Sequence, residues 1–166
     1  IFSKKVKINL NLDIRWPNDE DATQQIIPLK FQGEKVRHNS ELRELLATEL
    51  EDLLCRLFFD AESLLIESVT PGHSGAAVLR ATPYYLSGVG KSVIIKFGPA
   101  EQIEAEASNF LAYVQNFIGG SQNTVMLARN RTPRLAGIAY SLIGTASHHL
   151  ESFGSFYQRA EQEQIN

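Results

Sequence analysis

The sequence predicts an α+β fold, in which an antiparallel five-stranded sheet with one packed helix is preceded by a β-hairpin and an amphipathic helix. Three observations predict it: strict apolar alternation near the N-terminus, two segments with helical apolar spacing, and short apolar strands separated by glycine and proline turns. The chain has 166 residues, of which 43% are hydrophobic. This content suffices for a real core in one ordinary domain, or in a small domain with an appendage.

The N-terminal segment predicts a half-buried strand and its return. From Val6 to Trp16, apolar and polar residues alternate strictly. Turn formers and charges break the pattern at 17–21, and Ile26 to Phe31 returns as a second strand, with Pro28 on an edge. We therefore expect a hairpin, which either extends a sheet or offers a docking edge to another domain.

A leucine-rich segment predicts the amphipathic helix. It begins at a cap formed by Asn39 or Ser40 and ends near Phe59. Its apolar positions follow three-and-four spacing, which favours core packing over a seam for a partner helix, and its acidic face is expected to be solvated. We place residues 1–62 in an N-terminal extension of hairpin plus helix, and residues 63–166 in a second domain.

The second domain is predicted to be a meander of strands crossed by one helix. Glycines or prolines separate its strands, and Gly119-Gly120 ends its helix, on which Phe110, Val114 and Phe117 are expected to be among the most buried residues. A weak polar helix is predicted for 155–164. The five strands begin near Leu64, Ala76, Ser92, Val125 and Ala136, and the helix spans Ala100 to Ile118, with a loop at Pro83 to Gly88.

The residues from Pro71 to Glu106 point most clearly to chemistry. The turn Gly72-His73-Ser74-Gly75 lies between two apolar runs, and glycines there allow backbone N–H groups to approach a phosphate. Lys96 ends the apolar triplet 93–95, where an ammonium group needs a carboxylate or phosphate partner unless it reaches water. Either Glu104 or Glu106 of the following helix can orient it, because both flank the apolar stripe.

Composition and motifs exclude several other functions. A net charge of −3 without a dense Lys/Arg stripe argues against nucleic-acid binding. No apolar stretch is long enough to span a membrane, and Cys55 alone forms no internal disulfide, so we expect a reduced, cytoplasmic protein. No structural metal site is expected, and no serine-hydrolase elbow or Walker loop occurs. Because the chain begins with Ile1, we expect a piece of a longer protein.

Taken in order, these motifs resemble the small lobe of the aminoglycoside-phosphotransferase and choline-kinase branch of the kinase-like superfamily. The resemblance rests on Gly72 to Val78, on Val93 to Lys96, and on Glu106 with Phe110 and Leu111 after it. It implies that Gly72, His73, Ser74, Gly75, Lys96 and Glu106 form a site for ATP phosphates, and it selects Glu106 over Glu104. It places 138–144 as the last strand and the hinge. The run from Lys96 to Glu106 is also similar to the ternary complex associated domains of bacterial signalling and conflict proteins.

One departure from that superfamily decides what the chain is expected to do. After Gly144 the sequence has neither a catalytic loop with its Asp nor a magnesium-binding Asp, so we expect no catalytic or metal residue and no phosphate transfer by this chain alone. Two functions stay open. The favoured one is a non-catalytic kinase-like module of a larger signalling protein, bound to a protein partner or a neighbouring domain. The other is the nucleotide-phosphate half of a phosphotransferase whose catalytic lobe lies elsewhere.

Overall fold

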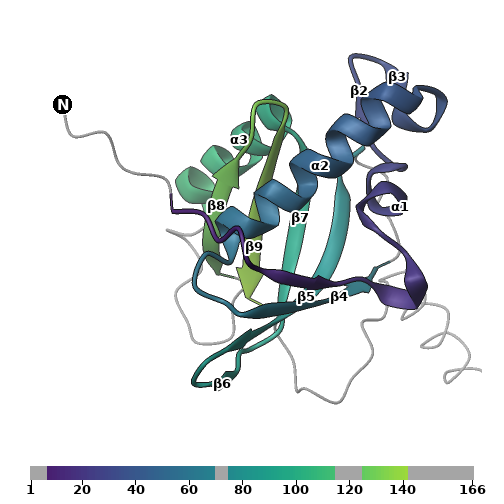
Figure 1. The fold of residues 1–166 in the computed structure, drawn as a ribbon. Coiled ribbons are helices and arrows are strands. Elements are labelled where there is room, and N and C mark those ends of the chain that lie inside the picture. The colour runs from purple at the N-terminus through teal and green to yellow at the C-terminus, as the bar shows by residue number, and fades with distance from the viewer. Residues whose placement is uncertain (1–6, 70–74, 115–124, 142–166) are drawn as a thin grey trace, which may run out of the picture.

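The fold is described by a computed structural model, which covers residues 7–69, 75–114 and 125–141. It is an α+β fold built on one twisted sheet (Figure 1). The strands are β1 (Asp13–Arg15), β2 (Lys30–Phe31), β3 (Glu34–Lys35), β4 (Ser63–Ser68), β5 (Ala77–Tyr85), β6 (Gly88–Val89), β7 (Val93–Pro99), β8 (Met126–Arg131) and β9 (Leu135–Ser141). The helices are α1 (Ala22–Ile26), α2 (Ser40–Leu57) and α3 (Ala100–Asn109), and a π-helical turn at Phe110–Val114 continues α3.

The sheet confirms the predicted antiparallel meander but has more strands than expected. Its order is β1-β4-β5-β7-β9-β8, with β6 paired to β5. The five predicted strands are β4, β5, β7, β8 and β9, which lie next to one another in the sheet, and all the pairings among them are antiparallel. The count of five was wrong because β1 joins β4 in parallel and the expected loop at Pro83 to Gly88 continues β5 into a tight turn to β6. The described part of the sheet therefore has seven strands.

The predicted N-terminal hairpin was also wrong. In the described part of the alternating segment only Asp13–Arg15 is a strand, because Asn9 forms competing bonds: its side chain accepts from the Asn11 N–H and donates to the Ala61 carbonyl. Asp21 forms a capping box with Gln24 and starts α1 at Ala22, so the chain is helical up to Ile26, and within the expected second strand at 26–31 only Lys30–Phe31 is extended, as β2. The hairpin that does form is β2–β3, outside the main sheet.

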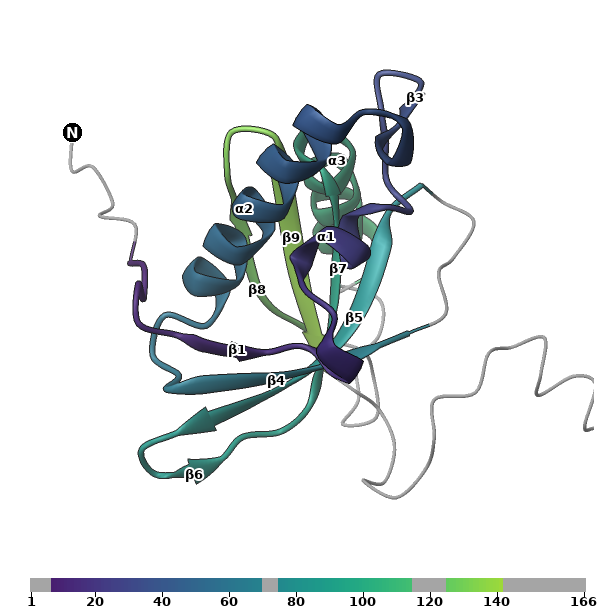
Figure 2. The same ribbon diagram turned by 45° about the vertical axis from the view of Figure 1, so that its right-hand side comes forward.

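Two helices, rather than one, cover the sheet, and they lie on opposite faces (Figures 1 and 2). The predicted leucine helix is confirmed as α2, and its buried side chains share a core with Leu79, Ile95 and Ala139. Residues of the opposite parity, including Ile138, pack under α3. A Cβ on Gly137 would lie 3.0 Å from Leu53 Cδ2, so α2 lies close against β9.

A buried carboxylate ties α2 to the turn between β8 and β9. Glu49 accepts hydrogen bonds from the Thr132 hydroxyl at 2.6 Å, the Arg134 N–H at 2.9 Å and the Arg134 guanidinium at 2.7 Å. Burial would raise the pKa of Glu49, but these hydrogen bonds and the charge of Arg134 outweigh it and lower that pKa. Contacts therefore cross the boundary placed between residues 62 and 63, and the proposed division stays a prediction.

Some predictions about the helices concern residues at or beyond the ends of the described ranges. Phe110 is half-buried, so it is not among the most buried residues. The side chain of Val114, Phe117, and the weak helix at 155–164 lie outside the described residues. In the described ranges, no helix is both long and apolar enough to cross a membrane.

Candidate functional site

The side chains of Lys96 and Glu106 meet on the α3 side of the sheet. In β7 the alternate residues Val93, Ile95 and Phe97 belong to the core under α2, so Lys96 projects from the other face. Its Nζ lies 2.8 Å from Oε1 and 2.7 Å from Oε2 of Glu106. Both side chains are mostly shielded, with 22% and 34% of their surface exposed. This contact confirms the predicted ion pair.

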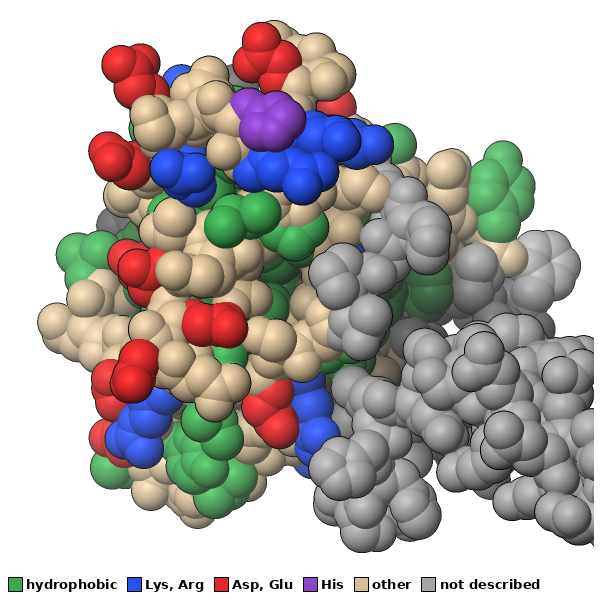
Figure 3. Space-filling view, turned by 90° about the vertical axis from the view of Figure 1, so that its right-hand side faces the viewer, with side chains coloured by type: hydrophobic (Ala, Val, Ile, Leu, Met, Phe, Trp, Pro, Cys, Tyr) green, Lys and Arg blue, Asp and Glu red, His purple; other side chains and the backbone are tan. Residues whose placement is uncertain are grey.

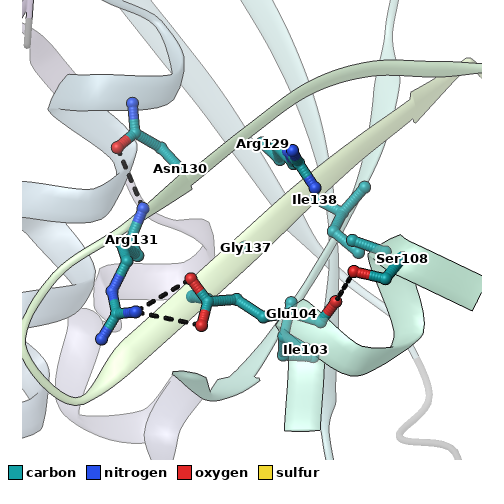
Figure 4. A pocket seen from close by; sticks show the side chains of 10 residues that line it. Ile103, Glu104, Ser108, Arg129, Asn130, Arg131, Gly137 and Ile138 are labelled. Carbon is teal, nitrogen blue, oxygen red and sulfur yellow. Dashed lines mark hydrogen bonds and ion pairs between the residues drawn. The ribbon is translucent and has the colours of Figure 1, made fainter. Parts of the chain in front are cut away.

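The neighbouring carboxylate has a different partner. Glu104 makes two contacts of 3.0 Å with one guanidinium nitrogen of Arg131 on β8, and Figure 4 shows the two side chains pointing toward each other. Helical periodicity left Glu104 and Glu106 equivalent because they flank the same stripe. The structure separates them, since Glu106 faces β7 and Glu104 faces β8.

The predicted glycine turn is described only at its end. Gly72, His73 and Ser74 lie outside the described residues. Gly75 has φ +76°, in the left-handed region that favours glycine, and no atom lies within 4 Å of where its Cβ would be. It lies two residues before β5, in which Val78 is the cross-strand neighbour of Lys96. Of the six predicted site residues, the structure thus pairs Lys96 with Glu106 and places Gly75 three residues before the strand neighbour of Lys96.

Beside the ion pair, the sheet presents a half-buried surface that we call the α3-side face; it comprises Val78, Arg80, Ile94, Lys96 and Tyr140. These residues have the opposite parity to Leu79, Ala81, Ile95 and Ala139, whose side chains fill the core under α2. The register places Ile94 between Arg80 and Tyr140. Apolar and charged groups therefore alternate across neighbouring strands on this face.

Tyr140 and Arg80 are the two members of this face with notable environments. The Tyr140 ring meets the Phe110 ring edge-on, with centroids 5.4 Å apart. Burial, and then the negative charge of Glu106, raise the pKa of Tyr140 to about 12, so its hydroxyl stays protonated at neutral pH. Arg80 Nε lies 3.3 Å from a Glu67 carboxylate oxygen but makes no well-directed hydrogen bond. Sequence reasoning missed Arg80, although its alternation with Leu79 and Ala81 indicated this face.

A separate hollow lies between α3 and the strands β8 and β9 (Figure 4). It has a volume of about 500 Å³ and a mixed lining, with Ile103 and Ala107 on one wall and Arg129 and Arg131 on the other. This hollow was not predicted from the sequence, because the segments that form its walls are far apart in the chain. Within 7–69, 75–114 and 125–141, no group of three or more metal-binding side chains comes together.

Comparison with known proteins gives a family. Residues 61–165 match the family described as ternary complex associated domain 9. No curated protein and no solved structure matches the chain. The matched segment begins just before β4 and contains β4 to β9, α3 and the Lys96–Glu106 pair. The chain therefore belongs to the ternary complex associated domain 9 family.

Proposed function

We propose that this domain is a non-catalytic module, similar to a kinase small lobe, that acts in protein interaction or regulation inside a larger signalling protein. The observation that carries the proposal is the Lys96–Glu106 pair beside the half-buried α3-side face. The strands β4, β5 and β7, with Lys96 on β7, and then α3 with Glu106 follow one another in the order that the kinase-like resemblance requires, and the sequence places Gly72 and Gly75 between β4 and β5.

The apolar surface around α3 supports an interaction role. Beyond the half-buried Phe110, the π-helical turn presents Leu111 and Tyr113, of which Tyr113 is 71% exposed. Aromatic residues beside half-buried aliphatic ones are typical of the central part of protein interfaces. On the α3-side face, Ile94 and Tyr140 add to this surface. The family name, which refers to a ternary complex, agrees with a role in assembly.

The charges of the face are already balanced, which also favours protein as the occupant. Lys96 is paired with Glu106, and Arg80 lies beside Glu67. A face of balanced charges and apolar groups suits a partner that buries area, because it offers little net attraction to a triphosphate. We therefore expect a neighbouring domain of the parent chain or a separate protein to cover it.

The alternative function is the nucleotide-phosphate half of a phosphotransferase. One observation favours it: an ammonium group has three donors, and among the described residues the two carboxylate contacts leave one donor of Lys96 for a phosphate oxygen. The conformation of Gly75 fits a turn whose backbone approaches a ligand closely. In this alternative, ATP phosphates contact Lys96 and the turn from Gly72 to Gly75.

Titration calorimetry with ATP and magnesium distinguishes the two functions. The wild-type chain is compared with Lys96→Ala and with Arg131→Ala, which breaks the other ion pair of α3. An interaction module shows no saturable heat with any of the three. Saturable binding by wild type and Arg131→Ala that is lost in Lys96→Ala would favour the nucleotide-binding alternative instead.

A further inference from the structure

The β2–β3 hairpin and the segment after it carry a cluster of positive charge, the basic patch, made of Lys30, Lys35, Arg37 and Arg43 with His38 beside them. Lys30 and Lys35 are direct cross-strand partners, and a 3-10 turn with Arg37 and His38 follows at once. Arg43 of α2 joins the patch by donating to the Arg37 carbonyl at 3.3 Å. Figure 3 shows Lys and Arg side chains gathered beside His38, the one histidine among the described residues.

The placement of these charges does not serve the stability of the hairpin. Like charges directly opposite each other in two strands are destabilising, and Lys30 and Lys35 occupy such a pair in a ladder of only two residue pairs. Arg43 lies near the N-terminus of α2, where the helix dipole disfavours a cation. The turn of the hairpin also holds Gln32 at φ 48°, which non-glycine residues rarely adopt.

No carboxylate within the described residues neutralises the patch. The ion pairs of the described residues involve other lysines and arginines, while Lys30, Lys35 and Arg37 are exposed and form no ion pair among those residues. Glu34 and Glu41 line a hollow of about 670 Å³ together with Lys35 and His38 but form no ion pair with them. Four cations against these two carboxylates leave local positive charge on a chain whose net charge is −3.

We infer that the basic patch is a docking surface for an acidic segment of a partner protein. Its cations come from both hairpin strands, the following turn and α2, so the occupant must span several elements with several carboxylates. Each exposed pair contributes little alone, and such a surface acts mainly through summed charge complementarity and orientation. The patch lies outside the α3-side face, so this inference does not depend on the proposed function.

Other anionic occupants fit less well. Nucleic acid binding by charge alone depends on the number of phosphates contacted, and four clustered cations on an acidic chain provide few contacts. Surface binding to an anionic membrane requires an apolar anchor beside the cations. The most exposed large apolar side chains of the described residues, Leu10 and Leu86, lie on other elements.

Fluorescence anisotropy tests the inference with a labelled peptide of alternating Glu and Ser. The test variant carries Lys30→Gln, Lys35→Gln and Arg37→Gln. The control carries Lys7→Gln, Lys91→Gln and Arg129→Gln, which changes the net charge equally at scattered exposed sites. We expect affinity to fall about tenfold in the test variant and less than about twofold in the control, and to weaken as salt rises. Arg37→Gln alone, with an unchanged melting temperature, gives a smaller loss in the same direction.

Three results would overturn the inference. One is the absence of peptide binding at low salt. Another is an equal loss in the test and control variants, which would show that only net charge matters. The third is tighter binding to an oligonucleotide of the same charge, or to phosphatidylserine vesicles, than to the peptide, because the partner would then not be an acidic protein segment.

Discussion

Replacing Glu49 by Gln is expected to weaken the attachment of α2 to the sheet. In the wild type the Glu49 carboxylate, with only 10% of its side chain exposed, accepts three hydrogen bonds from Thr132 and Arg134. A glutamine of the same size keeps one acceptor oxygen but places an NH₂ group where a second acceptor is needed. The substitution also removes the charge opposite Arg134.

The structure sets the size of this effect. Breaking a fully buried ion pair costs about 3–5 kcal/mol. The Arg134 side chain is 46% exposed, so its guanidinium can bind water when the Glu49 carboxylate is lost. We therefore expect Glu49→Gln to reduce the free energy of unfolding by about 2 kcal/mol at pH 7, the scale of one or two charged hydrogen bonds. Thr48→Val, at an exposed position next to Glu49 on α2, is the control and should change stability by less than about 0.5 kcal/mol.

The pH dependence gives this prediction its sharpest test. The pKa of Glu49 in the folded protein lies below its ordinary value of 4.5, so the folded state holds the charged form more strongly. Its contribution is therefore fully present above 4.5 and is lost as pH falls through the lowered pKa. Urea unfolding from pH 7 down to 3 should show the difference between wild type and Glu49→Gln shrinking only below about pH 4.5. A difference that stays constant across this range, or that is absent at pH 7, would refute the reasoning.

Three further predictions concern the rest of the fold. Glu106→Gln should lower the free energy of unfolding by about 1–2 kcal/mol, because it leaves the shielded Lys96 without its charged partner. Glu104→Gln removes a more exposed ion pair and should change the free energy of unfolding by less than about 0.5 kcal/mol. Equal effects of the two substitutions in urea unfolding would contradict the assignment of Glu106. Gly137→Ala should lower the free energy of unfolding by about 1–3 kcal/mol, since the new Cβ would lie 3.0 Å from the buried Leu53 side chain. Unchanged stability in thermal or urea unfolding would show that α2 can move away. Burial, and then the charges of Asp52 and Glu51, raise the pKa of the Cys55 thiol. Ellman's reagent should therefore react with Cys55 slowly at pH 8 and faster as pH rises. A reaction rate equal to that of a free thiol would contradict this environment.

The central meander and the ion pair were predictable because their signals are local. Apolar runs bounded by glycine and proline turns predicted the five strands of the meander, and a lysine at the end of an apolar triplet required a carboxylate that the next helix supplied. The choice between Glu104 and Glu106 came from the resemblance alone. This choice depends on which glutamate of α3 faces β7 and which faces β8, and helical periodicity does not determine that orientation.

What the sequence did not reveal depends on contacts between distant segments. The Asn9 side chain donates to the carbonyl of Ala61, 52 residues away, a contact that the alternation of the first segment does not contain. The expected second strand is extended only at Lys30–Phe31, where β2 pairs with β3 rather than with the first strand. The stripe of α2 was correctly predicted to be core-facing, but its close packing on β9 at Gly137 joins segments that are far apart in the chain. Glu49 appeared to be one of several acidic residues on that helix until the turn at Thr132 was placed beside it.

The central claim is that protein, rather than nucleotide, covers the α3-side face. Maleimide labelling of Ile94→Cys tests it in a Cys55→Ser background, with Leu86→Cys as an exposed control on the turn between β5 and β6. The account predicts that the cysteine at position 94 reacts at the same rate with and without magnesium and ATP in this chain, and more slowly than in this chain when the parent protein is assembled with its partners. The control cysteine should keep its rate throughout. Protection of position 94 by magnesium and ATP in this chain, or an unchanged rate in the assembled parent protein, would contradict the claim.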